Sequence, residues 1–331
     1  MEEIYPGIFM ITEKRLLSLV TPPSNLYVIT GHDGIVFDGG YGTKKALQSF
    51  VKEYRELESS YKLKGKIFNI DRVLLSHSHP DHFAGLNGIS KKLGLKILLT
   101  RQMADHISSA ENYTHQYREE NEGSISSGNI LKKVLVKLLY SLADAFFIKL
   151  YGISFLSEFE IVNYDKLIYI NDEPWQIIHT PGHCEDHIAL YNEKTGVLFS
   201  GDNVMRSITT WLGPPRSDIG SYVKSMKTLL ELPKLEIILS AHGSPVTNPR
   251  ERLKEIIKHR EDRTQEVLDI IKTAGNSGIS AKNIIKKMYT KEEMFKRLSS
   301  RGWVSLTLKQ LIDNRQIDLI KSKKDPIYVS R

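Results

Sequence analysis

Apolar runs that end in histidine or aspartate constrain the fold of this chain more than any other feature. Residues 71–76 ("DRVLLS") read as a buried strand, and the next six residues, "HSHPDH", hold three histidines and an aspartate. Three later segments repeat the pattern: "HTPGH", "LFSGD" and "LSAHG". A solvated loop does not need so many imidazoles, and a packed core cannot satisfy their ring nitrogens. The pattern therefore predicts metal ligands at the ends of strands.

Composition narrows the kind of metal site and the compartment. The single cysteine, Cys184, excludes a disulfide framework and a cysteine-rich zinc site, and it fits a reducing cytoplasm. The N-terminal residues show no signal peptide. The longest apolar stretch, 130–156, is interrupted by charges, so it favours an amphipathic helix over a membrane span. We expect a cytoplasmic protein with no membrane partner.

The first 249 residues predict a catalytic domain of the α/β (α+β) class. The helical spacing of apolar residues over 43–57 predicts an amphipathic helix. Short runs rich in β-branched and aromatic residues predict strands, and these are 25–30, 34–40, 71–76, 95–100, 166–170, 175–180, 187–192, 196–202 and 236–243.

Residues 104–165 break this pattern and read as an insertion. A polar, loop-like segment is followed by the amphipathic stretch, whose apolar stripe must be buried somewhere. Long ordered insertions are often functional. We expect this one to cover the metal edge as a lid or to build a homodimer contact.

Residues 250–331 predict a second, smaller domain. Three helices, the first over 250–274, are followed by two short strands, and this order suggests a winged helix. From Glu251 onward there are 19 Lys and Arg against 11 Asp and Glu, a net charge of +8, which leaves residues 1–250 at −1 out of the total of +7. A neutral body with a basic tail points to a polyanionic partner as readily as to a solvated lysine-rich surface.

The ligand set suggests two metal ions per chain. Imidazole nitrogens and carboxylate oxygens suit zinc by default, with manganese or iron as alternatives. Seven donors suffice for two ions that share a carboxylate and a hydroxide. The seven candidates are His77, His79, Asp81, His82, His183, Asp202 and His242.

The order His-x-His-x-Asp-His, Gly-His, Ser-Gly-Asp and His-Gly resembles the metallo-β-lactamase superfamily. The segments "TPGHCEDHIAL", "FSGD" and "HREDR" look like its β-lactamase-like protein 2 group, whose members carry a C-terminal winged helix. Asp38, in "IVFDGG", matches the position of the superfamily's early Asp-Thr-Gly motif. The sequence departs from the pattern at Gly39, where threonine is expected, and at Cys184, which replaces a usual threonine. It also departs in the insertion, which separates His82 from His183 by more than is usual in the group.

The resemblance implies an αβ/βα sandwich with metals at one edge. His77, His79 and His183 would hold the first ion, and Asp81, His82 and His242 the second. Asp202 would bridge the two. Asp81 would also orient a metal-bridging hydroxide that attacks an acyl or phosphoryl centre. His187 is a candidate for positioning substrate or leaving group, although a hydrogen bond to a ligand is the more common role of such a residue.

The substrate stays open at this level. Cleavage of single-stranded RNA follows from the resemblance and the basic tail, as it is an activity of some members of the group. Hydrolysis of a small thioester or ester, as in glyoxalase II, uses the same seven ligands. A nucleic-acid-binding regulator with an inactive metal site is a third hypothesis, and a mononuclear iron enzyme of the persulfide dioxygenase kind is not excluded by the residues.

Two arginines of the tail domain are candidates for binding a small anionic substrate. The apolar stripe of the helix over 250–274 continues through Arg260, which places a guanidinium on the inward face. Such a group needs an anion. We expect Arg260, and with it Arg263, to meet either a carboxylate of the body as a clamp or an anionic group of the substrate.

Overall fold

The computed structural model describes residues 1–13, 22–114, 145–164, 166–290, 293–320 and 325–331. The chain forms two compact units. The first unit comprises residues 1–179, 186–207 and 233–247, and the second comprises 180–185, 208–232 and 248–331. Residues 250–331 all belong to the second unit, which in addition takes up two earlier segments.

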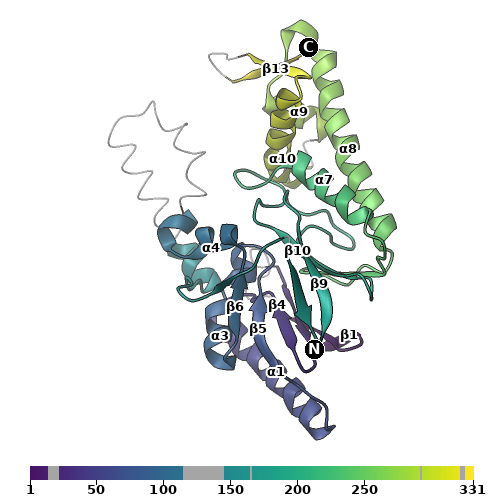
Figure 1. Ribbon diagram of the computed structural model, residues 1–331. Helices are drawn as coiled ribbons and strands as arrows, with labels where there is room; N and C mark the ends of the chain where they lie inside the picture. Colours follow the sequence, from purple (N-terminus) through teal and green to yellow (C-terminus); the bar gives the residue numbers. More distant parts are fainter. Residues whose placement is uncertain (14–21, 115–144, 165, 291–292, 321–324) are drawn as a thin grey trace. The chain divides into compact units, whose positions relative to one another are not determined.

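Two β-sheets build the first unit (Figure 1). In the described residues, the first sheet has seven strands in chain order, antiparallel up to the fourth and parallel from there on. Its strands are β1 (Glu2–Tyr5), β2 (Ile8–Thr12), β3 (Asn25–Ile29), β4 (Gly34–Phe37), β5 (Ile70–Leu74), β6 (Lys96–Leu99) and β7 (Glu160–Ile161).

The second sheet follows the reverse order of the chain, β12-β11-β10-β9-β8. Only the β11–β12 pair is parallel among its described strands. Its strands are β8 (Leu167–Ile170), β9 (Glu173–His179), β10 (Ile188–Asn192), β11 (Val197–Gly201) and β12 (Ile237–Ser240). The strands predicted from residue 25 onward are all present, whereas β1, β2 and β7 were not anticipated.

The core lies between the two sheets. Phe199 on β11 is fully buried, and its ring centroid is 5.1 Å from those of Tyr27 on β3 and Phe37 on β4, which belong to the other sheet. Trp175 on β9 adds a fourth ring at 5.8 Å. The chain thus folds as a mixed α/β sandwich, as the sequence predicted.

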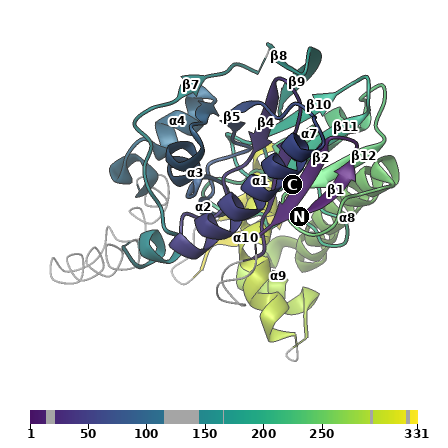
Figure 2. The ribbon, with the colours of Figure 1, turned by 90° about the horizontal axis from the view of Figure 1, so that it is seen from below.

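Helices cover the outer face of the first sheet (Figures 1 and 2). The helix α1 (Lys44–Leu63) begins after Thr43, whose hydroxyl caps it by accepting the N–H of Ala46. Its residues Phe50, Tyr54 and Leu57 recur at helical spacing and are buried in the core. The helix α3 (Leu86–Leu93) packs beside α1.

The ends of the predicted insertion belong to the body of the first unit. Helix α4 (Arg101–Ile107) runs past residue 104 with Ile107 fully buried, and β7 pairs with β6 as the last strand of the first sheet. The segment is therefore rooted in the sheet at both ends. Residues 115–144, which hold most of the apolar stripe, lie outside the described residues, so the lid and the homodimer contact stay predictions.

The second unit is mainly helical. It contains α7 (Ile219–Leu230), α8 (Pro249–Ala274), α9 (Ala281–Met288) and α10 (Met294–Asp313), followed by the antiparallel hairpin of β13 (Ile317–Ile320) and β14 (Ile327–Ser330). This is the predicted order of helices and hairpin, and the winged-helix assignment remains a prediction. No described helix is long and apolar enough to cross a membrane.

Replacing Phe199 tests the core between the sheets. Phe199→Ala should lower the free energy of unfolding by about 3–5 kcal/mol, because it removes an aromatic ring that contacts both sheets and leaves a cavity. Urea denaturation followed by circular dichroism measures the change. Leu63→Ala, at a side chain that is 89% exposed, is the control and should leave the transition unaltered. A loss below about 1 kcal/mol for Phe199→Ala would contradict this account of the core.

Candidate metal centre

The ends of three buried strands bring the candidate ligands of the first unit together. β5 ends at Leu74, and the chain continues through His77 into the short helix α2 (Pro80–Phe83), which carries Asp81 and His82. Asp202 directly follows β11, and His242 comes two residues after β12. β5 and β11 each pair with a strand on both sides, and β12 pairs with β11, so the ligands follow backbone that the sheets hold in place.

Six of the seven predicted ligands form two neighbouring groups in the first unit. The ligand atoms of His77, His79 and Asp202 lie within 4.8 Å of one another, and so do those of Asp81, His82 and His242. Asp202 also belongs to the second group by distance. Its Oδ1 is 3.3 Å from Nε2 of His82 and 3.2 Å from Nε2 of His242. Asp202 is thus placed where a bridging carboxylate would have to be.

Gly201 is required just before Asp202. Its backbone has a φ of +48°, a region that side chains other than glycine rarely adopt. A Cβ at this position would lie 2.5 Å from Nε2 of His187. The glycine of "SGD" therefore lets the end of β11 approach the histidines.

Hydrogen bonds define which ring nitrogen faces the cluster. Nδ1 of His242 donates to the carbonyl of Pro23 at 2.6 Å, and Nδ1 of His82 lies 3.0 Å from the carboxylate of Asp38. Nδ1 of His77 lies 3.0 Å from the hydroxyl of Ser76. Because these oxygens hold the Nδ1 protons, the neutral form of each imidazole has its lone pair on Nε2, and the Nε2 atoms face the carboxylates or the other imidazoles.

Asp38 organises this edge of the first sheet. It is buried, and it accepts the N–H of Ser76 at 2.7 Å, the hydroxyl of Ser76 at 3.0 Å and Nδ1 of His82 at 3.0 Å. Its φ of +68° is unusual for a residue other than glycine. This strain is consistent with a position that the surrounding hydrogen bonds determine.

The unsatisfied nitrogen of His82 fits a cation. His82 is 1% exposed, and its Nε2 is buried without a hydrogen-bond partner although two carboxylates lie within 4 Å. A buried polar atom of this kind is costly unless a ligand satisfies it. Two imidazoles and two carboxylates, those of His82, His242, Asp81 and Asp202, surround the same small volume, and their mixture of nitrogen and oxygen donors matches zinc and similar ions. The donor set therefore fits a metal.

Burial and neighbouring charges shift the pKa values of these candidate ligands toward the forms that bind a metal or pair with one another. Burial lowers the pKa of His77 well below its ordinary value, and the neighbouring His82 and His79 lower it further, so His77 is neutral at pH 7. Burial alone would raise the pKa of Asp81, but His82 and His242 outweigh it and lower that pKa to about 2. Burial likewise opposes protonation of His242, whose pKa Asp202 and Asp81 nonetheless raise to about 10. Without a cation, protonated histidines must balance the carboxylates.

His183, the seventh predicted ligand, lies in the second unit. Its Nδ1 donates to the carbonyl of Trp211 at 2.9 Å and lies 3.2 Å from the hydroxyl of Thr210. The hydroxyl of Ser217 holds the carbonyl of His183 at 2.6 Å. As in the first unit, an oxygen acceptor at Nδ1 makes Nε2 the nitrogen with the lone pair.

His187 is fully buried in the first unit, and hydrogen bonds engage both of its ring nitrogens. Nε2 accepts the backbone N–H of Asp202 at 3.1 Å, and Nδ1 lies 3.1 Å from the amide nitrogen of Asn203. This environment suits a residue that positions Asp202. Its predicted role at substrate or leaving group remains a prediction.

Sequence reasoning missed a second hydrogen-bonded group behind the histidines. The carboxylate of Asp186, fully buried, accepts the N–H of Ser78 at 3.2 Å and also its hydroxyl, and lies 3.1 Å from Nδ1 of His106. Ser78 stands between His77 and His79, so Asp186 holds the backbone that carries both ligands. The alternation "SHSH" and the Asp186-His187 pair were the available signals.

The two candidate arginines of the second unit have different surroundings. Arg260 is 5% exposed, and its Nη2 donates to the carbonyl of Thr210 at 2.9 Å. Arg263 pairs with Glu266 at 2.6 Å and lies over the rings of Tyr289 and Trp303, at 5.2 and 4.8 Å. Arg263 is therefore engaged within the helical unit, and contact of either arginine with substrate stays a prediction.

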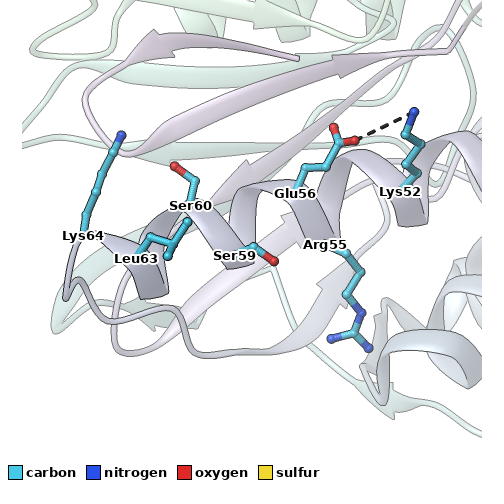
Figure 3. A pocket seen from close by; sticks show the side chains of 7 residues that line it. All are labelled: Lys52, Arg55, Glu56, Ser59, Ser60, Leu63 and Lys64. Carbon is cyan, nitrogen blue, oxygen red and sulfur yellow. Dashed lines mark ion pairs between the residues drawn. The ribbon is translucent and has the colours of Figure 1, made fainter.

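A surface pocket along α1 does not contribute to this centre. Side chains of the exposed face line it, including Lys52, Glu56 and Leu63 (Figure 3). Lys52 and Glu56 form an ion pair of 3.8 Å across one helical turn. None of the residues that line this pocket is a histidine, and the pocket has no ligand set for a transition metal.

Comparison with known proteins agrees with this geometry. The family model of the metallo-β-lactamase superfamily matches residues 20–242, which include all seven candidate ligands. The chain belongs to the metallo-β-lactamase superfamily. Its fold agrees with the crystal structure of a metallo-β-lactamase family protein from Thermus thermophilus, with a TM-score of 0.71 and 18% identity over 99% of this chain and 100% of that one.

Two curated relatives are similar to this chain over different shares of its length. The β-lactamase-like protein 2 homologue of Drosophila melanogaster is 28% identical over 46% of this chain and 51% of its own length. The atrochrysone carboxyl ACP thioesterase of Pseudocercospora fijiensis is 21% identical over 96% of this chain and 78% of its own length. The chain spans about half the length of curated relatives such as the fly protein.

Asp38→Asn tests the hydrogen bonds that orient His82. An amide cannot accept all three of the hydrogens that Asp38 now accepts, so it turns its NH₂ toward a donor and disturbs Nδ1 of His82 or Ser76. We expect the zinc affinity to fall about 10–100-fold, measured by competition with a chromogenic chelator. Asp71→Asn, at a side chain that is 55% exposed, is the control. Equal zinc affinity in both variants and the wild type would exclude this role of Asp38.

Proposed function

We propose that this protein is a metal-dependent hydrolase with a dinuclear centre, zinc being the default ion. The observation that carries the proposal is the pair of neighbouring ligand groups in the first unit, which share Asp202. His77 and His79 would hold one ion, Asp81, His82 and His242 the other, and Asp202 would bridge them. Membership of the metallo-β-lactamase superfamily supports the same assignment.

We assign His183 to the first ion. Chain connectivity supports this, because His183 is three residues from Asp186, whose carboxylate binds Ser78 between His77 and His79. Three residues span at most about 11 Å, so the chain itself limits how far His183 can be from Asp186. Its Nδ1 is occupied by the carbonyl of Trp211, and its Nε2 therefore carries the lone pair.

The residues of the chain would divide the work of hydrolysis as follows. Bound divalent ions would supply Lewis-acid catalysis and lower the pKa of water to about 7. Asp81, an ionised carboxylate because its pKa is about 2, would accept a hydrogen bond from the attacking water and orient it. His187 would hold Asp202 through the backbone N–H. Asp186 would keep the segment that bears His77 and His79 in place.

Among substrates, we favour a thioester or ester. The relative named a thioesterase aligns with 96% of this chain, more than the β-lactamase-like protein 2 homologue does. Near His183, the side chains of Trp211 and Ile208 are 56% and 60% exposed. The Trp211 ring lies over Gly213, where an added Cβ would be 2.3 Å away. An exposed indole on the residue whose carbonyl accepts from His183 suits an apolar acyl group.

Cleavage of single-stranded RNA is the second candidate. The likeness to the β-lactamase-like protein 2 homologue and the net charge of +8 over residues 251–331 support it. A nucleic-acid-binding regulator with an inactive metal site is less favoured, because the ligand set is intact.

Metal analysis tests the dinuclear centre. Protein purified without chelators should contain close to two transition-metal ions per chain by elemental analysis, and His79→Ala should retain about one or fewer. Prolonged chelation should abolish hydrolysis, and zinc or manganese should restore it. Less than one ion per chain, together with no activity on adding either metal, would refute the proposal.

A parallel assay tests the substrate class. We expect turnover of S-lactoylglutathione or an acyl-pantetheine thioester, none in His79→Ala, and little cleavage of labelled single-stranded RNA. Trp211→Ala should raise the KM for a long-chain acyl thioester more than for an acetyl thioester, because it removes apolar contact area. Cleavage of RNA alone, lost in His79→Ala, would reverse the order of the two candidates.

A further inference from the structure

We propose that Arg260 binds an anionic group of the substrate, a carboxylate or a phosphate, next to the ligand candidate His183. The inference rests on the proposed function, because it names a chemical feature of the substrate of the same site. It is carried by the burial, the hydrogen bonds and the charge environment of this one guanidinium.

Arg260 is buried with few of its hydrogen-bond donors satisfied. It lies on α8 and is 5% exposed, and Nη2 donates to the carbonyl of Thr210 at 2.9 Å. The guanidinium carbon is 5.7 Å from the centroid of the Tyr222 ring. Nε is buried and has no hydrogen-bond partner. A guanidinium has five N–H donors in a planar fork, and such a fork matches a carboxylate or phosphate with two parallel hydrogen bonds.

No carboxylate in the described part of the chain pairs with Arg260. Burial lowers the pKa of this guanidinium, and the nearby Arg263 also lowers it, whereas the phenols of Tyr222 and Tyr289 raise it. Arg216, also buried in the same unit, donates from Nε to Glu185 at 3.0 Å. Because an arginine stays protonated, its burial without an anion is costly. The missing partner indicates a ligand.

The position of Arg260 relates it to the candidate ligand His183 of the same unit. Thr210 accepts from Arg260 through its carbonyl, and its hydroxyl lies 3.2 Å from Nδ1 of His183. The next carbonyl, of Trp211, accepts from the same Nδ1. Arg260 and His183 thus share Thr210 as a hydrogen-bonding neighbour. An anion bound to Arg260 would hold the substrate beside His183.

A purely structural role for Arg260, in which it only ties α8 to Thr210, does not explain why a charged group is buried there. One hydrogen bond to a carbonyl needs a donor but no charge, and a glutamine amide would supply it without the desolvation penalty of a buried cation. Natural proteins tolerate such penalties mainly at functional sites. Anion binding and a structural clamp predict different changes in the melting temperature of the protein when the charge of Arg260 is removed.

The test measures thermal melting of the full-length, metal-loaded protein with and without inorganic phosphate or succinate. Arg260→Met should melt at the wild-type temperature or above it, because it removes an unpaired buried charge. The wild type should gain several degrees on adding one of the two anions, because a ligand that binds the native state stabilises it, and Arg260→Met should lose this gain. The anion that gives the larger gain identifies the group.

Two further variants distinguish anion binding by Arg260 from a structural role of this residue. Lys258→Met removes one positive charge from the exposed face of the same helix and should keep the anion-dependent gain of the wild type. Arg260→Gln retains a donor for Thr210 and should lose the gain. Lower melting or loss of folding in both Arg260 variants without anion would show a clamp and overturn the inference. An equal gain in wild type and Arg260→Met would place the anion elsewhere and overturn it as well.

The readout needs no turnover, so its failure is distinguishable from failure of the hydrolase proposal. A protein that holds metal and hydrolyses a neutral ester, with no response of melting to either anion, would refute the role of Arg260 alone. With an active substrate in hand, Arg260→Gln should raise the KM at least tenfold while kcat changes less than threefold.

Discussion

The carboxylate of Asp38 makes the interaction that holds the metal site in its geometry. It joins the end of β4 to the residues after β5 and to α2, because it accepts from the backbone and hydroxyl of Ser76 and from Nδ1 of His82. These bonds determine which nitrogen of His82 faces Asp202. Without them the imidazole could rotate, and its buried Nε2 would no longer be aimed at the second group of ligands.

The sandwich brings the two halves of the centre together. Asp38, His77, Asp81 and His82 come from the first sheet and its connections, whereas Asp202 and His242 follow strands of the second. The aromatic cluster around Phe199 packs the sheets face to face. Asn25 on β3 ties them again, since its amide donates to the carbonyls of Ser240 and Gly243 on either side of His242. Core packing and ligand geometry are therefore parts of one structure.

The second unit contributes two kinds of residue to the proposed function. His183 belongs to a turn that is held by Trp211, Thr210 and Ser217, and Arg260 holds the same Thr210 from α8. If His183 binds metal and Arg260 binds the substrate anion, as proposed, their shared neighbour Thr210 would couple substrate binding to the orientation of that ligand. The proposed role would explain the uncompensated charge of Arg260, because an internal carboxylate would compete with the substrate for the guanidinium.

Local patterns in the chain were enough to predict the strands that carry the ligands, the long helices and the seven ligand candidates, because apolar periodicity and histidine spacing are read from neighbouring residues. They also placed Arg260 on a buried helix face. Only the folded chain shows that Asp186 forms hydrogen bonds with Ser78 and His106. It also shows that His187 accepts the backbone N–H of Asp202. Arg260 donates to a carbonyl, whereas a carboxylate was one of the two expected partners. These partners are 28 to 108 residues apart for the Ser78 group and 50 apart for Arg260 and Thr210. Hydrogen bonds depend on distance and angle in space, and no local pattern encodes which distant atoms the packing of sheets and helices brings within about 3 Å of each other.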